Sequence, residues 1–523
     1  MNAESLDPPL TATTIWDLLD RRADATPEAT FGVDELRREM SFSEFRERSI
    51  DVAAGLADLG IGAGSVVSWQ LPSWIEAATL TMALCHLGAI QNPLIPILRA
   101  REVGFICRQA RTDLLIVPGE WRGFDYEGMG RTLAAEQERM HLLVASRKLP
   151  AGPRYALPAR HGGAPSAPWY FYTSGTTADP KGAKHSDTTL LAAATGFVDS
   201  LGLSAHDRVS LVIPITHVGG IIHILASLLT GGTSVFAEAF EPEATTRQLR
   251  EQAATIVPGG LPFVQVFFAF ADRHPEIAPL FPDARAMTHG GSPKPPVLFH
   301  ETRARFGLPI VSGYGMTECP MAVWNRPDDE DEDLALTEGR PVPGVELRTV
   351  GLDGSLMPPG EEGEVRLRGP QLMEGYVEAS LDGPAFDEQG FFRSGDLGIL
   401  DGAGRLRITG RLKDIIIRNM ENISATELEN LLFTHPKVGD VAVIGIRDAR
   451  TGERACAIIV PTDPGDPPHL AELQAHLRAT GLSDRKLPEQ LELVDSLPRN
   501  AMEKILKKEL RQRFDPTAPT HSI

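Results

Sequence analysis

Cysteine is scarce in this sequence, and no two cysteines lie close together. The chain of 523 residues contains four of them, Cys85, Cys107, Cys319 and Cys456. None forms a CxxC pair, so the sequence offers neither a cysteine-based zinc motif nor the framework of a disulfide-rich secreted protein. We therefore expect a protein of a reducing compartment, the cytoplasm.

Long apolar segments are also missing. The longest apolar stretch, residues 74–90, contains Glu76 and His86, and it is shorter and more polar than a membrane span. The first ten residues have neither a basic start nor an apolar centre, so they do not resemble a secretory signal. We expect no integral membrane segment.

Positive charge is in deficit. Lysine and arginine number 51 against 70 aspartates and glutamates, which gives a formal net charge of −19. This balance argues against nucleic acid as a partner and against binding to anionic membranes. It does not exclude small anionic ligands, because these need only local positive charge. The hydrophobic content of 42% is that of a globular protein, and the length exceeds one ordinary domain.

Short β-branched runs alternate with longer helical segments over much of the chain. Strand patterns occur at 65–71, 112–118, 208–214, 233–238 and 254–258, and residues 74–90 have the pattern of a buried helix. This alternation predicts layered α/β structure with a parallel sheet. After about Glu338 the strands alternate strictly, as at 364–369, which indicates a β-rich region. The acidic run 328–333 is expected to be a solvated loop.

The pattern of predicted strands and helices changes again after Gly410. Strand patterns at 438–446 and 455–460 and a helical pattern at 470–477 indicate a compact α+β unit of about a hundred residues. We therefore predict an α/β protein with a large N-terminal domain, residues 1–410, that combines layered α/β subdomains with a β-rich subdomain. A small α+β C-terminal domain, residues 411–523, follows it.

The segment YFYTSGTTADPKGAKHSD, Tyr170–Asp187, combines small residues, hydroxyls and lysines. Glycines let the backbone approach an anion closely, hydroxyls can rotate to donate to it, and Lys181 supplies a positive charge. The order Pro180-Lys181-Gly182 is the reverse of the standard Gly-Lys-Ser/Thr nucleotide pattern. The residues alone leave two interpretations, a different phosphate-binding loop or a polar surface turn.

Three further stretches contain candidates for nucleotide chemistry. In GYGMTE, residues 313–318, the Tyr314 ring could lie on a purine and Glu318 could hold Mg²⁺; the alternative is a strand-to-helix turn capped by Thr317. Asp396 follows a Gly turn, and it could accept both hydroxyls of a ribose or only bond its own backbone. Lys504 lies near the C-terminus among other basic residues. The ordinary interpretation of a lysine in such a helix is that it lies on the solvent-exposed face.

In this order and spacing the motifs resemble the adenylate-forming superfamily, which contains acyl-CoA synthetases, adenylation domains of peptide synthetases and firefly-type luciferases. The resemblance extends from Ile15 to about Arg511 and includes LGAIQNPLIP at 87–96. It implies a chain that uses ATP, with Mg²⁺ as cofactor. It also implies that the C-terminal domain is mobile, turns about a hinge at Lys413, and carries the catalytic Lys504.

The resemblance assigns a role to each matching position. Residues implied to hold the ATP phosphates are Thr173, Ser174, Gly175, Thr176, Thr177 and Lys181. Residues implied to surround the adenine are Gly290, Gly291, Ser292, Pro293, Tyr314 and Gly315. The remaining roles are the ribose contacts of Asp396 and Arg411, the α-phosphate contact of Thr317, the Mg²⁺ contact of Glu318, and the lining and gating of the acyl pocket by His217.

The region of the acyl pocket carries no acidic residue. Amino-acid-activating relatives usually place an Asp in or just before the segment that is 215–217 here, and this chain reads Ile213 to Gly220 without one. The candidate lining is small or apolar and includes His217, Gly219, Gly220, Gly313 and Met321. We expect a hydrophobic carboxylic acid as substrate: fatty, alicyclic, aromatic or sterol-derived. Ordinary core packing is the alternative for each residue taken singly.

The predicted function is that of an AMP-forming carboxylate–CoA ligase, with ATP and CoA as co-substrates. Asn419 and Met420 replace a common Gly-Gly beside the pantetheine tunnel, and Glu503 replaces the usual Gly before Lys504. An acyl-AMP ligase that loads a carrier protein is therefore one alternative. A degenerate nucleotide-binding protein is another, although the retention of Glu318 and Lys504 argues against it. The acid and the oligomeric state stay open, and a homodimer is one possibility.

Overall fold

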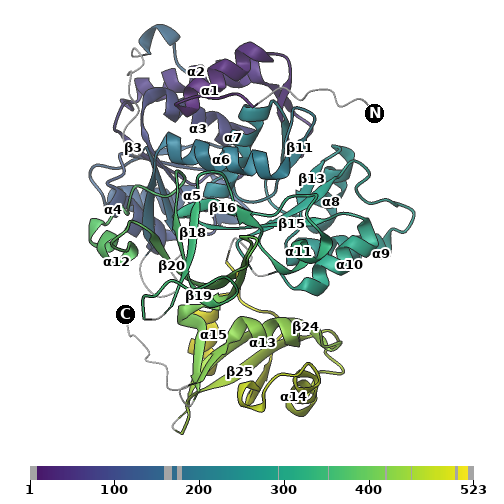
Figure 1. Ribbon diagram of the computed structural model, residues 1–523. Helices are drawn as coiled ribbons and strands as arrows, with labels where there is room; N and C mark the ends of the chain where they lie inside the picture. Colours follow the sequence, from purple (N-terminus) through teal and green to yellow (C-terminus); the bar gives the residue numbers. More distant parts are fainter. Residues whose placement is uncertain are drawn as a thin grey trace.

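The computed structural model describes residues 9–157, 168–173, 180–292, 294–351, 353–418, 421–448, 450–500 and 504–515. They form a larger body with three main sheets and a smaller body built around one sheet (Figure 1). The predicted fold class is confirmed, because α/β layers come first, a β-rich unit follows them, and an α+β unit comes last.

A nine-stranded sheet carries most of the motif residues. Its inner strands are parallel and its two edges are antiparallel. Strands buried on both faces require continuous apolar runs, and β12 and β13 are buried along their whole length. In spatial order the strands are β17 (Arg340–Pro341), β16 (Cys319–Trp324), β15 (Ile310–Met316), β14 (Ala286–Gly290), β13 (Ile256–Pro258), β11 (Arg208–Leu211), β12 (Thr233–Phe236), β1 (Thr30–Val33) and β2 (Glu39–Ser41).

A six-stranded sheet forms the second layer. Its strands are parallel except for the β9–β10 pair, which is antiparallel and contains most of the described residues of the segment Tyr170–Asp187. The strands, in spatial order, are β10 (Lys181–His185), β9 (Trp169–Thr173), β4 (Ile90–Pro93), β3 (Val66–Trp69), β5 (Leu114–Val117) and β8 (His141–Val144). A separate short hairpin consists of β6 (Glu120–Trp121) and β7 (Phe124–Asp125).

Helices contribute most of the principal core. Those that contribute to it are α1 (Ile15–Ala25), α2 (Phe42–Asp58), α3 (Ile75–Leu87), α6 (Asp187–Leu201) and α7 (Val218–Thr230). The α3 and α7 sequences are apolar on nearly all sides, which is the pattern of a helix buried between layers. The other helices of the layered part are α4 (Ala100–Ala110), α5 (Tyr126–Ala135), α8 (Pro242–Glu251), α9 (Leu261–Arg273), α10 (Pro296–Phe306) and α11 (Asp331–Leu336).

The acidic run at 328–333 is only in part the solvated loop that its composition suggests: Asp328, Glu330, Asp331 and Glu332 are exposed, but a helix begins within the run. Helix α11 begins at Asp331, and three of the carboxylates pair with arginines of neighbouring segments, including Asp331 with Arg303 at 3.4 Å. Asp329 lies 3.1 Å from Arg340, and Asp333 lies 2.5 Å from Arg405. The expectation of a loop was wrong for the second half of the run, which is helical, and tertiary partners that a charge run does not reveal neutralise part of its charge.

An antiparallel four-stranded sheet closes the larger body and confirms the predicted β-rich region. It contains β18 (Glu346–Val350), β19 (Glu362–Arg368), β20 (Phe392–Leu400) and β21 (Leu406–Arg411), with the short helix α12 (Asp382–Ala385) beside it. Figure 1 shows this sheet next to the smaller body.

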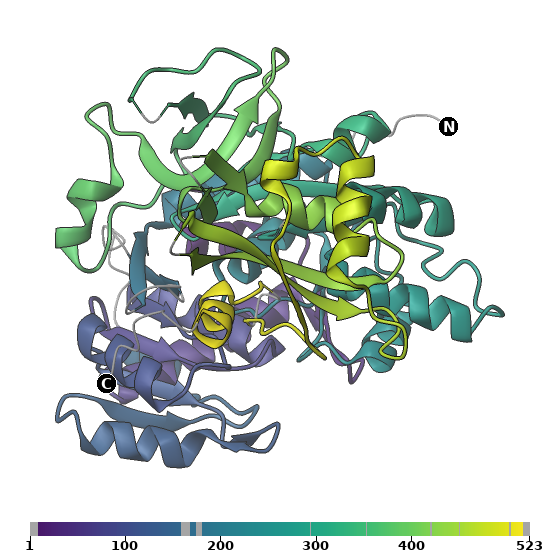
Figure 2. The same cartoon turned by 90° about the horizontal axis from the view of Figure 1, so that it is seen from below.

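The smaller body has its own sheet and its own cores. Its strands are β22 (Ile415–Arg418), β23 (Glu421–Ser424), β24 (Val438–Asp448), β25 (Gly452–Pro461) and β26 (Gln490–Leu493), and its helices are α13 (Ala425–Leu432), α14 (Leu470–Ala479) and α15 (Lys507–Phe514). Seen from below, it lies in front of the larger body (Figure 2). No helix of the described ranges is both long and apolar enough to span a membrane.

Candidate active site

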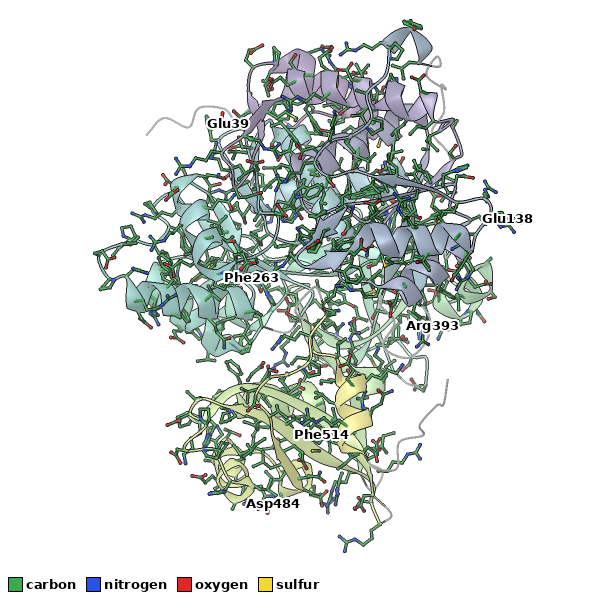
Figure 3. The ribbon with its side chains drawn as sticks, turned by 180° about the vertical axis from the view of Figure 1, so that it is seen from behind. Glu39, Glu138, Phe263, Arg393, Asp484 and Phe514 are labelled. Atoms are coloured by element: carbon green, nitrogen blue, oxygen red, sulfur yellow. The ribbon has the colours of Figure 1, made fainter. Side chains whose placement is uncertain are left out.

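A cavity of about 1110 Å³ lies where the two bodies meet. Figure 3 shows the two bodies from behind, with Phe263 labelled in the larger one and Asp484 and Phe514 in the smaller one. The cavity is lined by nine of the residues singled out in the sequence: Gly291, Ser292, Gly313, Tyr314, Gly315, Asp396, Arg411, Lys413 and Lys504. Residues from five separate segments of the chain and from both bodies therefore share one space.

Asp396 is the centre of a hydrogen-bonded group on one wall. Antiparallel pairing of β20 and β21 places it directly opposite Arg411, whose Nε lies 2.7 Å from Oδ1. The Tyr314 hydroxyl donates to Oδ2 at 2.8 Å. The carboxylate side chain is only 5% exposed, so it is not a turn aspartate that merely bonds its own backbone. The group fixes an aromatic ring, a carboxylate and a guanidinium side by side.

The predicted phosphate segment is described at its two ends. Thr173 is the last residue of β9 and pairs with Lys181, the first residue of β10. The Lys181 ammonium lies 5.7 Å from the centre of the Tyr376 ring. The predicted ligands between these ends, Ser174, Gly175, Thr176 and Thr177, lie outside the described residues, as does Pro293.

Thr317 and Glu318 form the turn between β15 and β16, and they are held by partners that the motifs did not indicate. His185 Nε2 donates to the Thr317 carbonyl at 2.8 Å, and burial lowers the pKa of this histidine to about 4, so the ring is neutral. The Tyr376 hydroxyl donates to Glu318 Oε1 at 2.9 Å. The alternative interpretation, a strand-to-helix turn with Thr317 as its cap, is wrong, because strand β16 follows at Cys319.

Glycines allow close backbone approach around the cavity. A Cβ atom at residue 313 would lie 2.3 Å from the Trp324 ring, and one at residue 315 would lie 2.7 Å from the Met321 nitrogen. Gly291 has a φ of +80°, which a residue with a side chain adopts only with strain. Gly290 pairs with Gly313 across β14 and β15. Small residues are thus needed here for packing as well as for any ligand.

Lys504 faces the Tyr314–Asp396–Arg411 group across the cavity. Its backbone is held by Asn500, whose N–H donates to the Lys504 carbonyl and whose side-chain oxygen accepts from the Lys504 N–H, each at 3.0 Å. Burial and the nearby Arg411 lower its pKa to about 8, against the opposing effect of Asp396. Lys413, the predicted hinge, lies in the short turn Leu412–Asp414 that leads out of β21.

His217 caps the buried helix α7. The Gly219 N–H donates to His217 Nδ1 at 3.1 Å, and burial together with the nearby His223 lowers the pKa of His217 to about 4. The imidazole is therefore neutral and carries its proton on Nε2. A Cβ at Gly220 would lie 2.4 Å from the Pro214 carbonyl oxygen, and Met321 has a φ of +51°. Tight packing fixes this region, as the alternative interpretation of core residues expected.

Sequence reasoning missed His185 and Tyr376, which hold the turn of GYGMTE. His185 stands inside the segment that opened with Tyr170, but its spacing gives no sign of a partner 132 residues away. Tyr376 contacts both Glu318, through its hydroxyl, and Lys181, through its ring, and it lies in no recognisable motif. Lys294 and Glu338, which also line the cavity, were not predicted either.

A two-body site of this kind, with a lysine of the smaller body facing the Tyr314–Asp396–Arg411 group, defines an adenylate-forming ligase, and the comparisons agree. A family model described as AMP-binding enzyme matches residues 19–377, and a model of the AMP-binding enzyme C-terminal domain matches residues 427–504. The chain belongs to the AMP-binding enzyme family.

Similar proteins cover nearly the whole chain. A medium-chain fatty-acid–CoA ligase of Escherichia coli is 31% identical over 517 residues, which cover 95% of this chain and 90% of that protein. A salicyl-AMP ligase / salicyl-S-ArCP synthetase of Mycobacterium tuberculosis is 32% identical over 495 residues, covering 92% and 86%. The solved structure of o-succinylbenzoate coenzyme A synthetase from Bacillus subtilis with ATP and magnesium ion is 27% identical with a TM-score of 0.82, covering 94% and 98%.

The donor set at Glu318 fits an Mg²⁺ ion that arrives with ATP. Among the residues with a described placement, no group of three or more His, Cys, Asp or Glu side chains could hold a metal ion. Mg²⁺ commonly binds one or two carboxylates and completes its coordination with substrate phosphates and water. A single carboxylate, oriented by Tyr376, is therefore a sufficient protein contribution.

Glu318→Gln is expected to weaken productive use of Mg·ATP while leaving the fold intact. The change replaces a hard anionic ligand by a neutral one of the same shape, and the Tyr376 hydroxyl can still donate to the amide oxygen. The Mg²⁺ concentration needed for half-maximal adenylation should rise by about tenfold. The measurement is acid-dependent pyrophosphate exchange across a Mg²⁺ titration, and an unchanged Mg²⁺ dependence would show that Glu318 is only structural.

The adenylation rate is expected to fall as the pH rises above about 8. The lowered pKa of Lys504 means that its ammonium loses its proton near this pH in the free enzyme. Because kcat/KM reports the free enzyme, its logarithm should decline with a slope near −1 above that pH. In Lys504→Arg the guanidinium stays charged, so any residual activity should lack this alkaline limb. An identical limb in both proteins would assign the titration to another group.

Proposed function

We propose that this ligase is an AMP-forming carboxylate–CoA ligase for a hydrophobic acid. The single observation that carries the proposal is the position of Lys504 opposite Tyr314, Asp396 and Arg411 in one cavity. A protein that only binds nucleotide has no need of a half-buried cation brought in from a separate body. This arrangement supports turnover over the degenerate nucleotide-binding alternative.

The first half-reaction is adenylation of the acid. A carboxylate oxygen attacks the α-phosphorus of ATP, the new O–P bond forms, and the bond to the β-phosphate breaks to release pyrophosphate. Negative charge builds up on the α-phosphate, where fixed cations stabilise the transition state. Lys504 would supply that charge, Asp396 and Arg411 would position the ribose, and Thr173 and Lys181 would bind the phosphates. Bound Mg²⁺ would neutralise phosphate charge.

The second half-reaction is thioester formation. A thiolate attacks the carbonyl carbon of the acyl-AMP, the C–S bond forms, and AMP leaves with the electrons of the C–O bond. We propose that the smaller body, taken as residues 411–523, turns about Lys413 between the two steps relative to residues 1–410. Lys504 faces the cavity here, which is the arrangement that adenylation requires. The turn would carry Lys504 away and admit the thiol.

The proposed acid is hydrophobic because the region of His217 is neutral and buried. No carboxylate lies between Ile213 and Gly220, and α7 is buried from Val218 to Leu229. An ammonium group would have no anionic partner there, and burial of an unpaired charge costs several kcal/mol, on the order of 3–5. Carboxylates of fatty and aryl acids carry no such group.

Hydrophobic monocarboxylic acids are therefore expected to drive pyrophosphate exchange at least a hundredfold faster than amino acids or dicarboxylates of similar size. This ratio corresponds to about 2.7 kcal/mol, which is below the cost of burying an unpaired charge. The measurement is ATP–pyrophosphate exchange with a panel of acids matched in length. The strongest exchange with a free amino acid would overturn this part of the proposal.

The acceptor thiol could instead belong to a carrier protein. The similarity to a salicyl-AMP ligase / salicyl-S-ArCP synthetase supports this second candidate, and the similarity to a fatty-acid–CoA ligase supports the first. The loop at Asn419 and Met420, which would face the thiol, lies outside the described residues. A direct comparison of CoA with a phosphopantetheinylated carrier protein as acceptors separates the two.

A further inference from the structure

Two charged residues that the proposed reaction does not use line the cavity beside the predicted adenine site. Lys294 follows the segment Gly290–Ser292 by two residues, just before α10, and Glu338 lies between α11 and β17. Figure 1 shows α10 and α11 at the side of the larger body nearest the smaller body. Both side chains therefore border the same space as Tyr314, Gly291 and Ser292.

The backbone holds Glu338 firmly at this wall. Its N–H donates to the Leu406 carbonyl at 2.7 Å, and the Leu406 N–H donates to the Gly339 carbonyl at 2.8 Å. This pairing joins the segment to the first residue of β21, the strand that ends at Arg411. Glu338 is thus fixed to the same strand that carries the predicted ribose contact.

Lys294 is 7% exposed, and its ammonium donates to the Leu334 carbonyl in α11. That single acceptor leaves two of its three N–H groups available. Burial lowers the pKa of Lys294 to about 8, against the opposing effect of Glu338. Burial raises the pKa of Glu338, and the nearby Lys294 opposes that rise. The two charges are therefore close enough to influence each other.

The Glu338 carboxylate accepts no hydrogen bond from any side chain or backbone group in the described part of the chain. Glu338 is partly exposed and lines the cavity, so its carboxylate is free to accept from a group that enters there. A bound ligand with an N–H group pointing at this wall would satisfy it.

We propose that Glu338 and Lys294 read the edge of the adenine base. Glu338 accepts a hydrogen bond from the exocyclic 6-amino group, and Lys294 donates one to the neighbouring ring nitrogen N1. Adenine presents this donor and acceptor side by side, whereas a 6-oxo purine presents an acceptor and a ring N–H in their place. The 6-oxo group would face a carboxylate, which repels it. The pair is a determinant of base specificity for the adenylation site.

The proposal rests on the nucleotide site described above and not on the identity of the acid or of the thiol. Its test is the ratio of kcat/KM for ATP to that for inosine triphosphate, which differs from ATP in the 6-oxo group and the N1 proton. A site built to bind an N–H group discriminates strongly against an analogue that lacks it. The wild-type ratio is expected to be about a hundredfold.

The decisive variant is Glu338→Gln, which keeps the shape of the side chain. Its amide can accept from a 6-amino group or donate to a 6-oxo group, so the ratio should fall by at least tenfold. Glu362→Gln is the matched control, because Glu362 lines the same cavity and is exposed, and its ratio should equal that of the wild type. Thermal unfolding of each variant separates a loss of fold from a loss of selectivity.

Three outcomes would overturn the proposal: a wild-type ratio near one, a preference for the 6-oxo nucleotide, or an unchanged ratio in folded Glu338→Gln. The first two need no variant. Calorimetric titration of the full chain with each nucleotide, without any acid, repeats the comparison for binding alone. If no acid supports pyrophosphate exchange but ATP still binds selectively, the proposed function fails and the base-reading pair stands.

Discussion

Replacing Lys504 with alanine is expected to slow acyl-adenylate formation by about a hundredfold to a thousandfold. The Lys504 ammonium is the charge that we assign to the α-phosphate, and it lines the same cavity as Asp396 and Arg411. A charge that stabilises the transition state by a few kcal/mol accounts for this loss, since about 1.4 kcal/mol corresponds to a factor of ten. Binding of ATP alone should change little.

The same variant should still form thioester when it is given synthetic acyl-AMP and CoA. Adenylation needs Lys504 beside the α-phosphate, whereas thioester formation needs a path for the thiol. Single-turnover measurement of each half-reaction separates the two. Lys508→Ala is the matched control, because Lys508 lines the same cavity from α15 and is exposed. Equal slowing of both half-reactions in folded Lys504→Ala would contradict a mechanism with two positions of the smaller body.

Asp396→Asn is expected to lower kcat/KM for ATP by about a hundredfold. The carboxylate accepts from the Tyr314 hydroxyl at 2.8 Å and from Arg411 at 2.7 Å, and it is 5% exposed. An amide of the same shape turns one acceptor into a donor, which opposes one of these two donors and removes the charge that pairs with Arg411. Both the ring over the base and the ribose contact should lose their positions. Steady-state kinetics of adenylation at varied ATP measures the effect.

Asp387→Asn provides the control for a general loss of stability. Asp387 is also buried and pairs with Arg348 and with Arg366, the latter at 3.1 Å, but it does not line the cavity. The variant should lower the free energy of unfolding by about 1–3 kcal/mol and leave the KM for ATP unchanged. An equal loss of ATP use in both variants would mean that Asp396 acts only through stability.

The strands of the layered part could be predicted because their signal is local. Residues 65–71, 112–118 and 233–238 contain the observed strands β3, β5 and β12, since a strand buried on both faces needs a continuous apolar run. The ion pairs of the acidic run at 328–333 could not be predicted, because Arg303, Arg340 and Arg405, which pair with its carboxylates, belong to other segments that only the fold brings close. A run of like charges predicts that its side chains are surrounded by solvent only when no side chains from other segments pair with them.

The site shows the same division between local and distant signals. Tyr314, Asp396 and Lys504 stand in recognisable motifs, so they could be predicted as site residues from the sequence. All three line one cavity, which agrees with that prediction. The groups that hold Thr317 and Glu318 in place could not be predicted. Tyr376 lies 58 residues from Glu318, and His185 lies 132 residues from Thr317, so only the folded chain brings each pair together.

The most direct test of the central claim follows the oxygen atoms of the substrate acid. A hydrophobic carboxylic acid labelled with ¹⁸O in its carboxyl group is incubated with the full chain, ATP, Mg²⁺ and CoA, and the products are identified by mass. Attack of the carboxylate on the α-phosphorus transfers one labelled oxygen to AMP, and the thioester keeps the other. We expect acyl-CoA and singly labelled AMP in equal amounts. Unlabelled AMP, or the label in inorganic phosphate with release of ADP, would contradict adenylation of the acid.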